Sequence, residues 1–254
     1  MKTHFRTKLK KGFVMCLSFI MICMIFCGCN PDAAGLGVYD ESTLVFKQFE
    51  PIEDGEEIAI VDTDLGSFKI RFFPDDAPNA VANFKQLVKE GFYNGTSIYN
   101  IQSVEDEGTE NTYNVAFMTG ASDENGAKGK TVINSGEPYP KELSYDLYPF
   151  PGAVAAYAEK KTCDSRFFVI GEAPISESVI KGMEVAQFPP IIQDKFKEIG
   201  GVPSLTHAYT IFAHIYDGYD VAQKIMQVEL DDKGRPVDDI CIKSITLENY
   251  SAEE

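Results

Sequence analysis

Residues 72–84 read Phe-Phe-Pro-Asp-Asp-Ala-Pro-Asn-Ala-Val-Ala-Asn-Phe. Pro74 ends the run of strand-forming residues before it, and Pro78 is the residue type that favours the first turn of a helix. Apolar residues then recur at helical spacing, at Val81, Phe84, Leu87 and Val88. Gly91 stops this pattern, so the stretch predicts a strand, a sharp turn and a helix over 78–90.

The residues around this stretch are typical of an antiparallel sheet. Upstream, 58–63 and 67–73 flank Asp64-Leu65-Gly66 and predict a β-hairpin. Downstream, a tight turn at 93–96 leads into a strand over 97–102. Further strands are predicted at 113–118, 153–157, 166–170, 209–215 and 240–247, with a second helix at 218–228. We therefore expect a mainly β fold: a closed antiparallel barrel of about eight strands capped by two helices.

The segment 171–205 is predicted to be a helical insertion before the penultimate strand. It contains two stretches with helical character, 177–186 and 191–199, followed by Gly200-Gly201-Val202-Pro203. An insertion at this place could cover a binding groove or pad the barrel. The sequence leaves both interpretations open.

The first residues form a targeting segment. Lys2, Arg6, Lys8, Lys10 and Lys11 precede a short apolar run over 12–26, which is the order of a signal peptide. The run ends on Phe26-Cys27-Gly28-Cys29, which resembles the lipobox of bacterial lipoproteins. That resemblance implies a signal peptide over 1–28, acylation of Cys29, and a lipid-anchored protein on the extracytoplasmic face of the cell membrane. A plain secretory signal and a retained membrane span are the alternatives.

The remaining chain divides into a tether over 29–56 and a domain over 57–250. The formal net charge is −16, and removing the five cations of residues 1–28 lowers it to −21. Such an acidic chain lacks the basic surface that phosphates require, so we expect no nucleic-acid partner. The charge either keeps an exported protein soluble or attracts basic unfolded clients. We expect a monomer.

The cysteines and histidines do not suggest a metal site or cofactor. Only Cys163 and Cys241 lie beyond the targeting segment, and His4, His207 and His214 are the only histidines. Their spacing matches no familiar zinc pattern. We read both cysteines as core or surface residues, with a single disulfide as the alternative.

Two separated blocks of the sequence resemble cyclophilins, the peptidyl-prolyl isomerases. The first comprises 62–66, 72–84 and Gly91-Phe92-Tyr93-Asn94-Gly95-Thr96, and the second runs from Tyr209-Thr210-Ile211-Phe212-Ala213 to Lys243-Ser244-Ile245. The resemblance covers nearly all of residues 57–248. It implies the cyclophilin barrel and binding of proline-containing peptides or unfolded exported proteins. It also implies catalysis by electrostatic stabilisation of the twisted amide, without nucleophile or metal.

Position by position, the resemblance assigns an apolar pocket for the proline ring. Phe117 and Met118 match the family's Phe-Met pair, and Phe168 matches its second strand aromatic. Leu205 keeps its place, and Tyr209 stands where the family has histidine. Each of these residues taken alone is typical of barrel core, but their joint placement favours the pocket.

The polar positions depart from the family. Asn100 stands at the position of the catalytic arginine, and it cannot supply a guanidinium. Gly120 and Arg166 occupy the two usual glutamine positions, and Tyr157 replaces a small alanine beside the residue before proline. Arg166 is a candidate substitute for the arginine, or simply part of a surface salt bridge. We therefore expect a peptide-binding cyclophilin-like protein with weak or absent isomerase activity; the alternative is a non-catalytic scaffold that uses the barrel and its insertion.

Overall fold

The computed structural model describes residues 44–105 and 111–252. The targeting segment, Cys29 and most of the tether lie outside these residues. Within 44–105 and 111–252, no helix is both long and apolar enough to cross a membrane.

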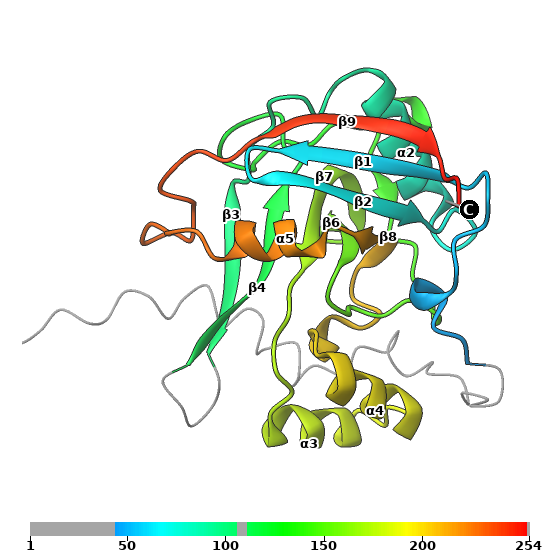
Figure 1. The fold of residues 1–254 in the computed structure, drawn as a ribbon, viewed down its shortest axis with the longest axis vertical. Coiled ribbons are helices and arrows are strands. Elements are labelled where there is room, and N and C mark those ends of the chain that lie inside the picture. Colours follow the sequence, from blue (N-terminus) through cyan, green and yellow to red (C-terminus); the bar gives the residue numbers. More distant parts are fainter. Residues whose placement is uncertain (1–43, 106–110, 253–254) are drawn as a thin grey trace, which may run out of the picture. The chain divides into compact units, whose positions relative to one another are not determined.

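Nine antiparallel strands form a single sheet (Figure 1). Along its main path the order is β3-β4-β7-β6-β8-β2-β1-β9, and β5 pairs with β7. The strands are β1 (Glu57–Thr63), β2 (Gly66–Phe72), β3 (Asn100–Glu105), β4 (Thr112–Thr119), β5 (Tyr139–Pro140), β6 (Ala153–Glu159), β7 (Thr162–Ile170), β8 (Thr210–Asp217) and β9 (Ile242–Asn249). The prediction of a mainly β, antiparallel fold is confirmed.

The sheet is not closed, so the prediction of a closed barrel is not confirmed. The two ends of the path, β3 and β9, share no ladder. They approach each other just before β3 begins, where Ser97 and Cys241 form an isolated bridge and the amide of Ile242 donates to the carbonyl of Thr96 (2.9 Å). Beyond that bridge β3 pairs with β4, while the amide of Ile101 donates to the carbonyl of Gly234 in the loop after α5 (2.7 Å). This loop occupies the edge that a closing strand would need.

Both predicted capping helices are present, α2 (Pro78–Lys89) and α5 (Tyr219–Met226). Pro78 stands in the first turn of α2, as predicted. The carboxylate of Glu142 accepts hydrogen bonds from the amides of Asn79 and Ala80 (both 3.0 Å) and so satisfies free donors at the start of this helix. The strand predicted at 97–102 begins later, at Asn100, and β5 was not predicted because it spans only two residues.

Alternation along the strands produces two apolar clusters, one on each face of the sheet. The inner cluster includes the buried faces of α2 and α5, with Phe84 packed against Phe72, Tyr93, Phe167 and Phe212. The outer cluster has as its buried members Phe73, Ala116, Leu147, Ala153, Ala155, Phe168, Ile170 and Ile211. Met118, Tyr157, Val202, Leu205 and Tyr209 are partly buried against it.

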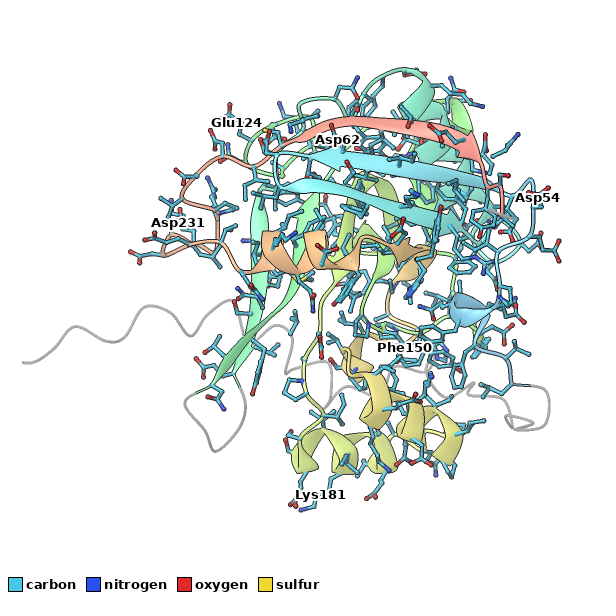
Figure 2. The ribbon with its side chains drawn as sticks, viewed as in Figure 1. Asp54, Asp62, Glu124, Phe150, Lys181 and Asp231 are labelled. Atoms are coloured by element: carbon cyan, nitrogen blue, oxygen red, sulfur yellow. The ribbon has the colours of Figure 1, made fainter. Side chains whose placement is uncertain are left out.

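The insertion between β7 and β8 forms α3 (Glu177–Val185), α4 (Pro190–Ile199) and the short helix η4 (Pro203–Leu205), which confirms the predicted helices. The ring of Phe196 in α4 is fully buried and lies 4.7 Å from that of Phe150. Figure 2 labels Phe150 between the sheet and α4. The insertion is therefore packed through aromatic contacts on the segment that directly precedes β6.

The described end of the tether also packs on the domain. Gln48, in the short helix η2 (Lys47–Phe49), is buried, and its side-chain amide pairs with both backbone groups of Tyr148. The amide nitrogen donates to the carbonyl of Tyr148 (2.9 Å), and the amide oxygen accepts from the backbone N–H of Tyr148 (2.7 Å). Arg71 donates to the carbonyl of Glu50 (2.6 Å). The segment from residue 44 onward is thus held by specific contacts with the sheet.

Candidate functional site

One transverse row of residues crosses the sheet at the predicted site. Asn100 of β3 pairs with Met118 of β4, which pairs with Phe168 of β7. Phe168 pairs with Ala155 of β6, and Ala155 pairs with Ile211 of β8. Directly paired residues on neighbouring strands point to the same face. The row therefore places Asn100 on the outer face, beside Met118 and Phe168.

Most of the predicted pocket residues meet in the outer cluster. Phe168 is buried there, and Met118, Tyr157, Leu205 and Tyr209 pack around it while keeping part of their surface exposed. The rings of Phe168 and Tyr209 meet edge-on, with centroids 5.0 Å apart. These residues come from β4, β6, β7, η4 and the approach to β8. The result is an apolar, partly open surface of the kind that can hold a proline ring.

Phe117 does not share this surface. It precedes Met118 on β4, so its side chain points to the opposite face, and it belongs to the inner cluster with 1% of its surface exposed. Phe117 is therefore a core residue in the structure and does not line the predicted pocket.

Asn100 is already engaged by the loop between α5 and β9. Its amide nitrogen donates to the carbonyls of Lys233 (3.1 Å) and Gly234 (3.3 Å), and its carbonyl accepts from Gln102. Gly234 has a φ of +76°, and a Cβ there would lie 2.9 Å from the carbonyl oxygen of Ile101. The side chain at the arginine position thus fastens a tight turn against β3.

The backbone explains the departure at Gly120, one of the two glutamine positions. Its φ is +80°, and a Cβ would lie 2.5 Å from the carbonyl oxygen of Ser165. A glutamine would require both a left-handed backbone and displacement of β7. The local backbone therefore requires glycine at position 120 and excludes the family's glutamine.

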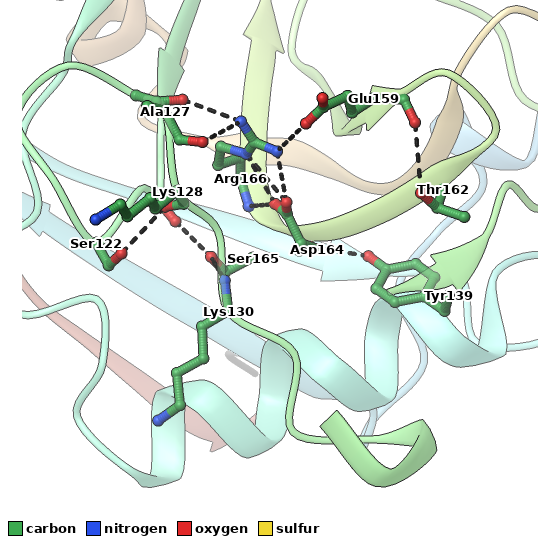
Figure 3. A network of polar contacts seen from close by, with 12 residues as sticks. Ser122, Ala127, Lys128, Lys130, Tyr139, Glu159, Thr162, Asp164, Ser165 and Arg166 are labelled. Carbon is green, nitrogen blue, oxygen red and sulfur yellow. Dashed lines mark hydrogen bonds and ion pairs between the residues drawn. The ribbon is translucent and has the colours of Figure 1, made fainter. Parts of the chain in front are cut away.

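Arg166, at the other glutamine position, lies in a dense polar network (Figure 3). Its Nε donates to Asp164 (3.0 Å), one terminal nitrogen donates to the carbonyls of Gly126 (3.1 Å) and Ala127 (3.3 Å), and the other contacts Asp164 (2.6 Å) and Glu159 (3.4 Å). These contacts use all five N–H groups of the guanidinium. Only 6% of the side chain is exposed.

The charge on Arg166 is retained despite burial. Burial opposes ionisation, but the hydrogen bond and the charge of Asp164 outweigh it, so the pKa of Arg166 is raised. The guanidinium carbon also lies 4.7 Å from the centroid of the Tyr157 ring, within the range of a cation–π contact. Arg166 therefore holds both the loop at 126–127 and the Tyr157 ring.

The residues that sequence reasoning did not identify are those that hold the site residues in place. Asp164 is the main partner of Arg166, and a Cβ at Gly129 would collide with it at 2.0 Å. The tyrosine ring of Tyr99 packs against Gly126. An acid two residues before an arginine on one strand is a visible signal for the first contact. The close approaches at Gly126 and Gly129 depend on how the loop folds back, which periodicity does not reveal.

The remaining polar groups give no indication of a metal or disulfide site. Among residues 44–105 and 111–252, no group of three or more His, Cys, Asp or Glu side chains is placed to hold a metal ion. Cys163 is buried and Cys241 partly buried, and both are free thiols. Burial raises the pKa of the Cys163 thiol to about 11, so this thiol is not an activated nucleophile.

The mainly β fold with its helical caps is that of a cyclophilin, as the comparison with solved structures shows. A cyclophilin type peptidyl-prolyl cis-trans isomerase of Cryptosporidium parvum matches with a TM-score of 0.58 and 19% identity, covering 77% of this chain and 99% of that one. A structure of the same kind determined in the presence of the dipeptide Ala-Pro matches with a TM-score of 0.57, covering 76% of this chain and 99% of that one, also at 19% identity.

The model of the family "Cyclophilin type peptidyl-prolyl cis-trans isomerase/CLD" matches residues 58–247, and the chain belongs to this family. A protein of Staphylococcus saprophyticus named "Putative peptidyl-prolyl cis-trans isomerase" is 28% identical over 198 residues, which cover 76% of this chain and 93% of the relative. A protein of the same name from Staphylococcus epidermidis is 26% identical over 200 residues, covering 78% of this chain and 94% of the relative.

Proposed function

We propose that this cyclophilin is a lipid-anchored, extracytoplasmic protein that binds proline-containing peptides on its outer cluster and isomerises them weakly or not at all. One observation carries the proposal: the row Asn100–Met118–Phe168–Ala155 keeps an apolar surface but has no cation at its polar end. The solved relative obtained with Ala-Pro supports the ligand class.

Weak catalysis follows from the side chain at position 100. The X-Pro bond rotates over a barrier of about 18–20 kcal/mol, and a catalyst must stabilise the twisted amide. Asn100 is uncharged, and its amide nitrogen is committed to the carbonyls of Lys233 and Gly234. Losing one preorganised donor costs about 3–4 kcal/mol of transition-state stabilisation, or roughly 10² to 10³ in rate.

Arg166 as a substitute donor remains a prediction, and its contacts favour a supporting role. Each of its N–H groups would have to leave Asp164, Glu159 or a loop carbonyl before it could reach a peptide. We therefore expect Arg166 to position the Tyr157 ring beside the outer cluster. Residual turnover that disappears in Arg166→Ala, with peptide affinity unchanged, would assign it the catalytic role instead.

The test is a peptide titration run beside a protease-coupled isomerisation assay on proline tetrapeptides. We expect measurable binding and slow turnover. Met118→Glu should abolish binding, because it places a carboxylate in the apolar surface. Leu65→Glu, in the turn between β1 and β2 and already 36% exposed, is the matched control and should bind normally. Binding that survives Met118→Glu, or no binding by the wild type, would favour the scaffold alternative.

A further inference from the structure

Beside the outer cluster, where we propose that the proline ring binds, Tyr157 and Arg166 form a cation–π pair on the same face of the sheet. Tyr157 lies two residues beyond Ala155 on β6, and Arg166 lies two residues before Phe168 on β7, so both continue the outer face alongside the row. The register between β6 and β7 shifts after Ala156, which places Tyr157 opposite the bulged segment that holds Arg166. We call this pair the Tyr157–Arg166 stack.

The stack is fixed from behind. The guanidinium of Arg166 is immobilised by Asp164, by Glu159 and by the carbonyls of Gly126 and Ala127, as Figure 3 shows. The Tyr157 ring lies against this immobilised cation at 4.7 Å. A rotation of the Tyr157 side chain away from the outer cluster would break its cation–π contact with Arg166. The ring therefore presents a rigid surface, unlike a side chain that can move aside for a ligand.

The stack borders the same surface that we propose for the proline ring. Tyr157 is partly exposed and packs on the cluster that contains Phe168 and Tyr209. Tyr209 directly precedes Thr210, which pairs with Ala156 of β6, and its ring lies 5.0 Å from that of Phe168. Because Tyr157, Met118 and Phe168 belong to the same cluster, a proline bound on Met118 and Phe168 brings an adjoining peptide residue into the neighbourhood of Tyr157.

We propose that the Tyr157–Arg166 stack determines specificity by admitting only a small side chain, glycine or alanine, next to the bound proline. This inference rests on the proposed function and narrows its substrate class. Tyr157 acts through direct contact with the peptide. Arg166 is a positioning residue that acts through Tyr157.

The experiment measures dissociation constants for two series of tetrapeptides, with Gly, Ala, Leu or Phe placed immediately before the proline in one series and immediately after it in the other. In the wild type, one series should show at least about tenfold tighter binding of Gly and Ala than of Leu and Phe, as expected when a fixed wall excludes several methylene groups. Tyr157→Ala should reduce this ratio to less than about threefold, chiefly by tighter binding of the large residues.

Two further variants separate size from other effects. Tyr157→Phe keeps the ring and the contact with Arg166, so it should retain the wild-type ratio; a ratio that collapses in Tyr157→Phe would overturn the inference in favour of a hydroxyl contact. Arg166→Lys keeps a charge but loses the planar fork, so it should relax the ratio in part, provided that thermal unfolding shows a folded protein.

The remaining outcomes also decide the matter. A wild type that binds peptides with no size preference in either series, or a Tyr157→Ala variant with an unchanged ratio, contradicts the stack while leaving peptide binding intact. A wild type that binds none of the peptides, beside a Tyr157→Ala variant that binds small and large ones alike, contradicts the inference, because the stack would then exclude glycine and alanine as well. Failure of both proteins to bind any peptide contradicts the proposed function and the inference together.

Discussion

At the scale of residues, the proposed function depends on Asn100, which stands at the position of the family's catalytic arginine. Its place in the row beside Met118 and Phe168 agrees with the position that the resemblance gives the arginine. Its role in fastening Lys233 and Gly234 could not be predicted from the sequence, because the partners lie more than 130 residues away. Of the apolar positions, Phe168 and its partly buried neighbours lie together in the outer cluster, whereas Phe117 lies in the inner one. The polar contacts could not be predicted, because they depend on how distant loops meet.

Asn100→Arg tests the missing charge. We expect kcat/KM for proline tetrapeptides to rise by about 10- to 100-fold, because part of the lost electrostatic stabilisation returns. Asn100→Ala is the matched control, since it frees the same two carbonyls without adding charge. Turnover that is equal in the two variants would show that the groove lacks something other than the cation.

His214 predicts a pH-dependent stability. It is buried on β8 beside Gln48, whose amide nitrogen lies 3.1 Å from Nδ1, and burial together with the charge of Arg71 lowers the pKa of His214 to about 3. In the unfolded chain the pKa is about 6.5. Below about pH 6.5, His214 therefore binds a proton in the unfolded chain but stays neutral in the folded chain. Stability is therefore unaffected by His214 above about pH 6.5 and falls as the pH drops towards 3.

The effect is measurable by urea unfolding at pH 7 and pH 5. His214 should account for about 2 kcal/mol of the stability lost between these values. His214→Gln removes the titrating group, so its free energy of unfolding should change less over the same interval. An identical pH dependence in wild type and variant would show that the carboxylates alone cause the loss.

At the scale of elements, the long periodic segments were predictable, whereas the start of β3 and the two-residue strand β5 were not. The helices at 78–90 and 218–228, and both helices of the insertion, were found within one or two residues of their predicted limits. The strand at 97–102 was placed too early, because Ser97 contributes only an isolated bridge and the ladder with β4 begins at Asn100. Closure of the sheet could not be judged from local patterns, since it depends on contacts between the chain's distant parts.

The insertion should depend on one aromatic contact. Phe196 of α4 is fully buried against Phe150 and also approaches Phe188. We expect Phe196→Ala to cost about 3–5 kcal/mol locally, through lost burial and the cavity that remains. Hydrogen exchange should then show lost protection across 177–199, while the strands β6 and β7 stay protected.

Ile191→Ala, on the same helix but 38% exposed, is the control and should leave exchange nearly unchanged. Loss of protection throughout the sheet in Phe196→Ala would mean that the insertion is part of the main folding unit. Equal exchange in both variants would contradict the aromatic contact as the source of its stability.

At the scale of the whole molecule, the tether joins the proposed anchor to a folded domain that begins before residue 57. Lys47 contacts Asp76 (3.0 Å) and Asp146 (3.1 Å), and Phe49 packs on Phe150. The lipid anchor itself remains a prediction from residues 1–29. If it is correct, residues 30–43 connect the acylated Cys29 to this domain.

Cys29→Ala tests the anchor in cells. The variant should leave the membrane fraction and appear in the soluble extracytoplasmic fraction, because the acylated residue is removed. Cys27→Ala, two positions earlier, should remain in the membrane. Retention of both variants would identify the apolar segment at 12–26 as the anchor, and release of both would point to a signal that is cleaved elsewhere.

The proposed function requires that the protein bind prolyl peptides without the catalytic power that an arginine at position 100 would supply. A two-dimensional NMR exchange spectrum of an Ala-Pro tetrapeptide with the purified protein reports binding and cis–trans exchange together. We expect ligand shifts that saturate with protein concentration, and exchange roughly 10² to 10³ slower than with an arginine-bearing cyclophilin under the same conditions. Saturating shifts with equally fast exchange, or no ligand shifts at all, would contradict the account.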